Sequence, residues 1–559
     1  MSATTRTTRS SRWASDSTTD EVVAVEAGRR RIGGAVIAAA ALAAVAGCGT
    51  PGGSAGEPAA APAAPEPYQP TWESLAAHDA APAWFREAKF GIYAHWGVLS
   101  VPAFGNDWYP RNMHVAGTDE HRHQVETYGP LERFGYHDFV PRFTAERYDP
   151  EEWADLFHRA GARFAGMVAE HHDGFSMWDS AVNPWNAGDR GPRRDVLGAL
   201  ERAVRGRGMR FVTSFHMARN LQLYQDRPEA QTDSSYFPWV QGWATASTDP
   251  ELRILYGNLP PERFFENWEA KLAEVVDRYA PDLIYFDGLL VKITEAYKLR
   301  FLARTFNRAA ERGADVVITY KDDEIPSTIG VPDYEKGRVD YLAPEPWLTD
   351  ETISTGSWSH VEGLEYRPVH EILHILADVV SKNGTLMLNV SPRADGSLPV
   401  EQREILLEIG EWLRTHGEAI YGTRPWLVYG EGPTVMRRSG AFAPRVEYRP
   451  EDIRYTSAGN RVYAIALGWP GPGRELVLSA FAEARAAGTR VLDVSILGAP
   501  EALAWERRTD GLAITTPSTP PSRHAVVFRI RTAGRAGAPR RRGPGTGSSR
   551  ITKRNREKR

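Results

Sequence analysis

Short apolar runs alternate with amphipathic stretches from about residue 85 to residue 420 of the chain. The runs are rich in β-branched and aromatic residues and do not alternate with polar residues, which is typical of strands buried on both faces. The pattern predicts six strands, at residues 90–94, 163–169, 210–215, 283–286, 316–320 and 386–390.

The segments between these runs have apolar residues at i, i+3, i+4 and i+7, the spacing of a helix that buries one face. Asp149 and Asp195 each precede such a stripe and are predicted N-caps. Further helical stripes cover residues 268–279 and 372–380, and we expect the second to end at residues 383–384, Asn-Gly.

Repeated strand–helix units over this length predict a (β/α)8-like parallel barrel. A doubly wound sheet is the alternative, and no Gly-rich dinucleotide or phosphate-binding loop follows any strand to support it. After Tyr421 the pattern changes to short strand-like pieces separated by turn residues, which predicts an antiparallel β-sandwich. We therefore predict an α/β barrel domain at residues 71–422 and a C-terminal β-sandwich at residues 423–533.

The two ends of the chain do not have the composition of a folded domain. Residues 1–48 are predicted to be an extension and a secretion signal, in which a 12-residue apolar run, 35–46, follows three arginines. The run ends in Val-Ala-Gly-Cys, which resembles a bacterial lipobox and predicts lipidation of Cys48; the alternative is an ordinary signal with a chance cysteine. Residues 49–70 are an Ala/Pro/Gly-rich tether, and residues 534–559 a basic disordered tail. We expect an exported protein, lipid-anchored on the extracellular face of a bacterial membrane or secreted.

Composition narrows the chemistry. The chain of 559 residues is 25% charged and 42% hydrophobic, as in globular proteins, and its net charge of −4 does not favour nucleic-acid binding. A single cysteine excludes disulfides within the chain, zinc ribbons and iron–sulfur clusters. Carboxylates, histidines and hydroxyl groups remain to carry the chemistry.

Polar residues follow the predicted strands, and residues in this position meet at one face of a parallel barrel. They are His95 and Trp96, His171 to Asp173, His216 with Arg219 and Asn220, Asp287, Lys321 to Glu324, and Asn389. Imidazoles and indoles in one pocket can bind a hydroxylated ring, and two carboxyl groups can then cleave a glycosidic bond. Two alternatives remain: the histidines could hold a metal ion, or they could be hydrogen-bonded core residues without chemistry.

The motifs at these strand ends resemble α-L-fucosidases of glycoside hydrolase family 29. The resemblance covers residues 84–426. It is carried by WFREAKFGIYAHWG (84–97), EHHDGFSMWDS (170–180), DLIYFDG (282–288) and NGTLMLNVSPRADGSLP (383–399). It implies a barrel enzyme that removes terminal α-L-fucosyl residues from glycans by a two-step covalent mechanism, without a metal or organic cofactor.

The resemblance also implies roles for particular residues. Asp287 falls on the nucleophile. Glu335 in YEKGR is our choice of acid/base, with Glu345 and Glu351 as alternatives. The substrate-binding residues implied or expected are His95, Trp96, Asp107, Trp108, His171, His172, His216 and Trp358.

The expected partner is a fucosylated glycan or glycoconjugate; no nucleic acid is expected, and contact with a membrane only through the lipid anchor. Two other functions are compatible with the sequence, a metal-dependent hydrolase on the same barrel and a non-catalytic glycan-binding protein of the cell surface. Linkage preference, natural glycan and oligomeric state do not follow from the sequence.

Overall fold

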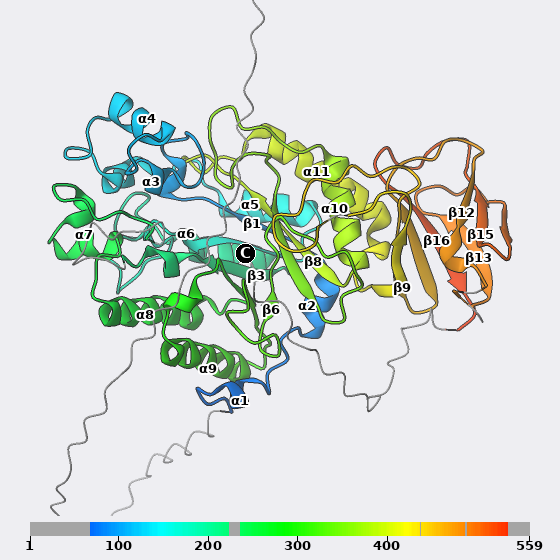
Figure 1. Ribbon diagram of the computed structural model, residues 1–559, viewed down its shortest axis with the longest axis horizontal. Helices are drawn as coiled ribbons and strands as arrows, with labels where there is room; N and C mark the ends of the chain where they lie inside the picture. Colours follow the sequence, from blue (N-terminus) through cyan, green and yellow to red (C-terminus); the bar gives the residue numbers. More distant parts are fainter. Residues whose placement is uncertain (1–66, 223–234, 437, 484, 487–488, 535–559) are drawn as a thin grey trace, which may run out of the picture. The chain divides into compact units, whose positions relative to one another are not determined.

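The computed structural model describes residues 67–222, 235–436, 438–483, 485–486 and 489–534 (Figure 1). The predicted signal with Cys48, most of the predicted tether and nearly all of the basic tail lie outside the described residues. No helix within the described ranges is both long enough and apolar enough to cross a membrane.

Eight parallel strands form one nearly closed barrel, in the order β6-β5-β4-β3-β2-β1-β8-β7. They are β1 (Phe90–Ala94), β2 (Phe164–Glu170), β3 (Arg210–Phe215), β4 (Leu283–Phe286), β5 (Val317–Tyr320), β6 (Val331–Pro332), β7 (Trp347–Thr352) and β8 (Gly384–Val390). Strand β1 pairs with both β2 and β8, and an isolated parallel bridge between Asp333 and Leu348 brings the end of β6 to β7. The predicted parallel barrel is confirmed.

All six strands predicted from the apolar runs are present, and β1, β3 and β4 have the predicted bounds. The apolar pattern does not predict β6 or β7. Strand β6 has only two residues, and β7 reads WLTDET, so that buried Asp350 and buried threonines interrupt its apolar character. Polar side chains inside a barrel are compatible with burial because neighbouring strands supply hydrogen-bond partners.

Helices separate most of the barrel strands. They are α1 (Trp72–Leu75), α2 (Ala83–Ala88), α3 (Tyr109–Asn112), α4 (Asp119–Thr127), α5 (Pro150–Arg159), α6 (Val196–Gly206), α7 (Pro250–Leu255), α8 (Pro261–Tyr279), α9 (Glu295–Glu311), α10 (Val369–Ser381) and α11 (Val400–His416). Asp149 and Asp195 cap α5 and α6 as predicted: Asp149 accepts from two backbone N–H groups of the first turn, and Asp195 from one. Helix α10 ends at Ser381, and Asn383 takes the left-handed conformation (φ 74°) that is common just after the end of a helix. Gly384 is already the first residue of β8.

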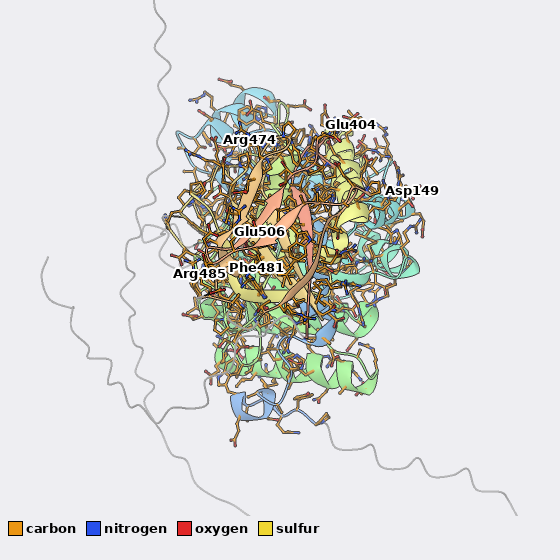
Figure 2. The ribbon with its side chains drawn as sticks, turned by 90° about the vertical axis from the view of Figure 1, so that its right-hand side faces the viewer. Asp149, Glu404, Arg474, Phe481, Arg485 and Glu506 are labelled. Carbon is orange, nitrogen blue, oxygen red and sulfur yellow. The ribbon has the colours of Figure 1, made fainter. Side chains whose placement is uncertain are left out.

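Two antiparallel sheets follow the barrel, ordered β13-β16-β11-β10-β9 and β12-β15-β14, which confirms the predicted change of architecture. Their strands are β9 (Arg424–Glu431), β10 (Ile453–Ala458), β11 (Arg461–Ala466), β12 (Glu475–Leu478), β13 (Val491–Ile496), β14 (Trp505–Arg507), β15 (Leu512–Thr515) and β16 (Val526–Thr532). Figure 2 looks toward these strands, with Phe481 and Glu506 labelled. The sheets enclose their own apolar core, in which Phe481 stacks on Trp426 with ring centroids 4.5 Å apart.

Buried polar contacts join the second domain to the barrel helices. Asp378 of α10 binds Arg454 of β10 (Oδ1 to Nε, 2.6 Å) and Lys382 (Oδ2 to Nζ, 2.8 Å). Arg454 and Lys382 hold the pKa of Asp378 well below its usual range against the effect of burial, which alone would raise it. The indole N–H of Trp412 in α11 donates to the carbonyl of Ala525 (2.9 Å). Removal of any one of these three side chains would leave a buried charge unpaired, so the ion cluster depends on both parts of the chain.

Candidate active site

A cavity of about 750 Å³ opens at the carboxyl ends of the barrel strands. Among the described residues that line it are nine of the predicted site residues: His95, Asp107, Trp108, His171, His172, His216, Asp287, Glu335 and Trp358. Residues separated by up to about 260 positions in the chain therefore share one cavity, at the face where barrel enzymes place their active sites.

Asp287 is the first residue after β4, and Gly288 (φ 68°) turns the chain immediately behind it. Its Oδ2 lies 3.1 Å from Nε2 of His172 and 3.0 Å from Nδ1 of His216, and its Oδ1 accepts from Nζ of Lys321. The side chain is 20% exposed, so it faces the cavity while its oxygens lie against side chains from three other strand ends.

These neighbours determine the charge of Asp287. Burial would raise its pKa, but Lys321, His216 and His172 outweigh burial and hold the pKa well below its usual range. The carboxylate is therefore ionised at neutral pH, as a carboxylate that attacks carbon must be.

Lys321, the first residue after β5, connects Asp287 with Glu335. Its Nζ donates to Asp287 and lies 2.6 Å from Oε2 of Glu335. Two oxygens that share one donor lie no more than roughly 6 Å apart. The sequence predicts Lys321 at a strand end but gives it no role, and the structure adds it to the site.

Glu335 has the opposite electrostatic setting to Asp287. Burial raises its pKa, Lys321 lowers it, and the carboxylates of Asp350 and Asp287 raise it; together they place the pKa at about 7. Glu335 therefore holds its proton at acidic and nearly neutral pH, whereas Asp287 does not. Two carboxyl groups whose environments drive their pKa values apart are suited to separate acid and nucleophile roles.

The two alternative acids lie elsewhere. Glu345 is exposed on the loop before β7 and does not line the cavity. Glu351 is buried, but its Oε1 accepts from Arg367 (3.2 Å) and from the backbone N–H of Thr352 (2.9 Å), and it does not line the cavity either. The cavity geometry favours Glu335 over both.

Asn389 of β8, which the sequence predicts at a strand end without a role, fixes the ring of His95. Its Oδ1 accepts from the backbone N–H of His95 (2.9 Å) and from Nδ1 of the same residue (2.8 Å), while its Nδ2 donates to the carbonyl of Trp358 (2.7 Å). Because Nδ1 of His95 carries the hydrogen, Nε2 of the neutral ring is the acceptor. Burial lowers the pKa of His95 well below its usual range and so keeps the ring neutral.

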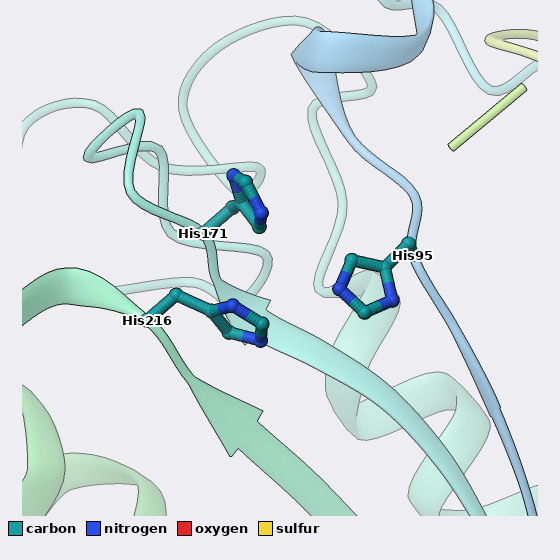
Figure 3. Close-up of side chains that lie close together, drawn as sticks. All are labelled: His95, His171 and His216. Carbon is teal, nitrogen blue, oxygen red and sulfur yellow. The ribbon is translucent and has the colours of Figure 1, made fainter. Parts of the chain in front are cut away.

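The rings of His95, His171 and His216 converge from the ends of β1, β2 and β3 (Figure 3). Their centroids lie 5.7 Å (His95–His171), 5.2 Å (His95–His216) and 4.8 Å (His171–His216) apart. Burial lowers the pKa of His171 well below its usual range, and Nδ1 of this ring has no hydrogen-bond partner among the described residues. Neutral imidazoles that converge on one space can hold the hydroxyl groups of a sugar.

Trp108 and Trp358 supply aromatic surface to the cavity. Trp358 lies 5.1 Å from the His95 ring, and its backbone N–H donates to Oδ1 of Asp107 (3.2 Å). Trp108 lies 5.7 Å from the His172 ring, with the guanidinium of Arg219 above it at 5.1 Å. Arg219, which the sequence noted without a role, also lines the cavity.

The prediction that Trp96 binds substrate is wrong. Its indole N–H donates to the carbonyl of Arg393 (2.7 Å), its ring packs against Tyr148 and Trp153, and it does not line the cavity. Successive side chains of an extended segment point to opposite sides, so that when His95 faces the cavity, Trp96 faces the core.

A pair of acidic residues that the sequence does not mark as site residues, Asp333 and Asp350, also lines the cavity. Oδ2 of Asp350 accepts from the hydroxyl groups of Tyr93 (2.9 Å) and Tyr285 (3.0 Å), and Oδ1 of Asp333 accepts from the backbone N–H of Asp350 (3.1 Å). Burial, and then the neighbouring Asp350, raise the pKa of Asp333 well above its usual range. No sequence signal marks this pair, because Asp350 lies within a strand that the apolar pattern does not predict.

Among the residues that the structure describes, two groups of side chains have a composition that could hold a metal ion: His95 with His171 and His216, and His172 with His216 and Asp287. In the second group, a metal ion would bind the carboxylate of Asp287, which could then not attack carbon. Nδ1 of His216 faces that carboxylate, and Ser214 lies 3.1 Å from Nε2. A metal at this position and a covalent role of Asp287 are therefore competing uses of the same atoms.

We expect prolonged dialysis against a chelator to leave the hydrolysis of a nitrophenyl α-L-fucoside within about two-fold of the untreated rate, because carboxyl groups alone can cleave a glycosidic bond. The measurement is initial rate before and after dialysis, together with the metal content of the protein. Loss of activity that is restored by zinc or another transition metal would assign the site to a metal hydrolase.

Lys321 offers a second test, in which Lys321→Met removes a cation that lowers the pKa of both Asp287 and Glu335. Because both pKa values then rise, we expect both limbs of the pH profile of kcat/KM to move to higher pH, with a fall of roughly 10²-fold at the optimum. Lys321→Arg keeps the charge and should keep the profile near its original position. A Met variant with an unshifted profile contradicts this electrostatic role.

Comparison with known proteins agrees with this geometry. The family model described as alpha-L-fucosidase matches residues 57–418, and the model of the alpha-L-fucosidase C-terminal domain matches residues 447–531. The tissue alpha-L-fucosidases of Homo sapiens and Rattus norvegicus are 33% and 32% identical to the chain; each alignment covers 83% of this chain and 91% of the relative.

Solved structures give the same result. The crystal structure of the Thermotoga maritima alpha-fucosidase in complex with fucose has a TM-score of 0.65 and 29% identity, and the match covers 83% of this chain and 100% of that one. Because the family model matches more than half of the chain and the relatives align over most of it, the chain belongs to the α-L-fucosidase family of glycoside hydrolases, family 29.

Proposed function

We propose that this protein is a retaining exo-α-L-fucosidase that removes terminal α-L-fucosyl residues from glycans in two steps. The observation that carries the proposal is the pair of carboxyl groups around Lys321, an ionised Asp287 and a Glu335 whose pKa is about 7. Two carboxyl groups linked through one ammonium group fit the separation of about 5–5.5 Å of retaining enzymes better than the 6.5–9.5 Å of inverting ones.

In the first step, Asp287 attacks the anomeric carbon and Glu335 gives its proton to the departing oxygen, so that a glycosyl-enzyme ester forms and the aglycone leaves as an alcohol. In the second step, Glu335 takes a proton from water, the water oxygen attacks the anomeric carbon, and the ester breaks to free Asp287. Two inversions give net retention. Nε2 of His95, fixed as an acceptor by Asn389, binds a sugar hydroxyl in this scheme, while the indole of Trp358 covers an apolar face.

The substrate class follows from the family and from the buried, histidine-lined end of the cavity, which suits a single small sugar ring. The relative from Thermotoga maritima binds fucose. Release of nitrophenol from 4-nitrophenyl α-L-fucoside tests the proposal, with the β-L-fucoside and an α-L-rhamnoside as controls. Proton NMR of the first product formed must show the α-anomer of fucose, and first formation of the β-anomer rejects retention.

We also propose, from the sequence alone, that the enzyme acts outside the cytoplasm on fucosylated glycans or glycoconjugates, held to the membrane through Cys48. The basis is the lipobox-like segment that follows the apolar run and precedes the tether.

A further inference from the structure

A segment from the second domain reaches the acid/base loop of the barrel. Residues 438–443, in the connection between β9 and β10, pair antiparallel with residues 335–338 of the barrel. Arg338 and Gly440 exchange both backbone hydrogen bonds (3.2 and 2.8 Å), and the N–H of Phe442 donates to the carbonyl of Glu335 (2.7 Å). The backbone of the proposed acid is therefore held by a segment that lies more than 100 positions further along the chain.

This pairing places Phe442 at the mouth of the cavity. Gly440, Ala441 and Phe442 all line it, and the Phe442 side chain is 58% exposed. Among the large apolar side chains that are exposed in the described ranges, Phe442 is the one that lines the cavity. Its backbone has φ 51°, a conformation that costs free energy in a residue with a β-carbon and that often marks a functional position.

The position of Glu335 tells which part of a substrate Phe442 can meet. The sugar that Asp287 attacks lies toward the buried imidazoles, whereas the oxygen that Glu335 protonates belongs to the leaving group. A group bonded to that oxygen must leave the cavity past the loop that carries Glu335. Phe442 is hydrogen-bonded to that loop and offers an uncovered aromatic ring there.

We propose that Phe442 is the platform for the leaving group, so that the second domain contributes the part of the site that selects the aglycone. The platform suits aglycones with a flat apolar face, either an aryl group or the C–H face of a pyranose, because such faces stack on an aromatic ring. The inference rests on the proposed fucosidase function and extends it from the sugar that is cleaved off to the group that is released.

The test compares Phe442→Ala with the unmodified enzyme on three donors. They are α-L-fucosyl fluoride, which has no aglycone ring, 4-nitrophenyl α-L-fucoside, and an α-L-fucosyl-N-acetylglucosamine disaccharide. We expect kcat/KM to fall roughly 10-fold for the two donors with a ring and to stay within about two-fold for the fluoride, because one stacked ring contributes about 1–1.5 kcal/mol. Phe442→Trp keeps an aromatic platform and should retain activity on all three.

The fluoride also reports whether Glu335 has moved. Fluoride leaves without a proton from an acid, but hydrolysis of the glycosyl-enzyme still needs Glu335 as base. An unchanged kcat on α-L-fucosyl fluoride therefore shows that Glu335 is correctly placed. Val435→Ala, in the same connection, 76% exposed and outside the cavity lining, is the matched control and should leave all three donors unaffected.

Equal losses on all three donors would overturn the proposal, because they would mean that Phe442 only supports Glu335. Unchanged kinetics on all three would also overturn it, because an aglycone platform cannot then exist at this residue. If the unmodified enzyme hydrolyses none of the three, the fucosidase proposal itself fails, and the inference fails with it.

Discussion

Replacing Asp287 by Ala is expected to lower kcat/KM on 4-nitrophenyl α-L-fucoside by on the order of 10⁵-fold, the largest effect of any single change in the site. The reason is that the variant has no group that can form the glycosyl-enzyme, whereas the rest of the cavity remains. The carboxylate lies against Lys321 and two histidines, so that its loss also leaves Lys321 without one of its two carboxylate acceptors.

The control is Asp315→Ala, which removes an exposed aspartate just before β5, at the opposite end of the barrel, and should leave kcat/KM unchanged. Azide should restore part of the activity of the Asp287→Ala variant, because the small anion fits the space left by the carboxylate and attacks the anomeric carbon directly. A single displacement inverts the centre, so that the product must be the β-L-fucosyl azide. Turnover by the Ala variant at the rate of the unmodified enzyme would show that another residue is the nucleophile.

The sequence predicts the parts of the barrel whose strands are apolar on both faces, and those strands carry His95, His171, His216 and Asp287 to the cavity. Because parallel strands present their carboxyl ends at one face, the polar residues that directly follow apolar runs identify the site from the sequence alone. The prediction fails for β6 and β7, because the hydrogen bonds that allow Asp350 to be buried come from tyrosines on β1 and β4.

Other features of the site could not be predicted because they depend on how distant segments meet. Trp96 adjoins His95 in the sequence but faces the core, since the pleat of an extended chain turns neighbouring side chains to opposite sides. The pairing of Phe442 with the backbone of Glu335 joins two domains through main-chain groups, which leave no trace in side-chain patterns. Lys321 is visible as a strand-end residue, but its contact with two carboxyl groups depends on the distance between two loops.

Glu335→Gln should give the second largest effect, and its size should depend on the leaving group. With a sugar aglycone, we expect kcat/KM to fall roughly 10³- to 10⁴-fold, because an alkoxide cannot leave without a proton. With 2,4-dinitrophenyl α-L-fucoside, whose phenolate leaves unaided, kcat/KM should fall by less than about ten-fold while kcat falls strongly, since the second step then lacks its base. Glu345→Gln and Glu351→Gln are the matched controls, and neither should show this dependence on the leaving group. A uniform loss on all donors would remove the acid/base role from Glu335.

The pH dependence provides an independent test of the same residue. Glu335 must be protonated to act as an acid, and burial places its pKa at about 7, so kcat/KM on a sugar aglycone should be high below pH 7 and fall as pH rises through that value. The Gln variant cannot lose a proton, and its residual kcat/KM should therefore show no alkaline limb.

Azide should accelerate the Glu335→Gln variant as well, but here the anion attacks the glycosyl-enzyme formed by Asp287, so that the product is the α-L-fucosyl azide. The opposite anomers expected from the Asp287 and Glu335 variants together assign the two carboxyl groups, because only a nucleophile and an acid/base in these places give both products.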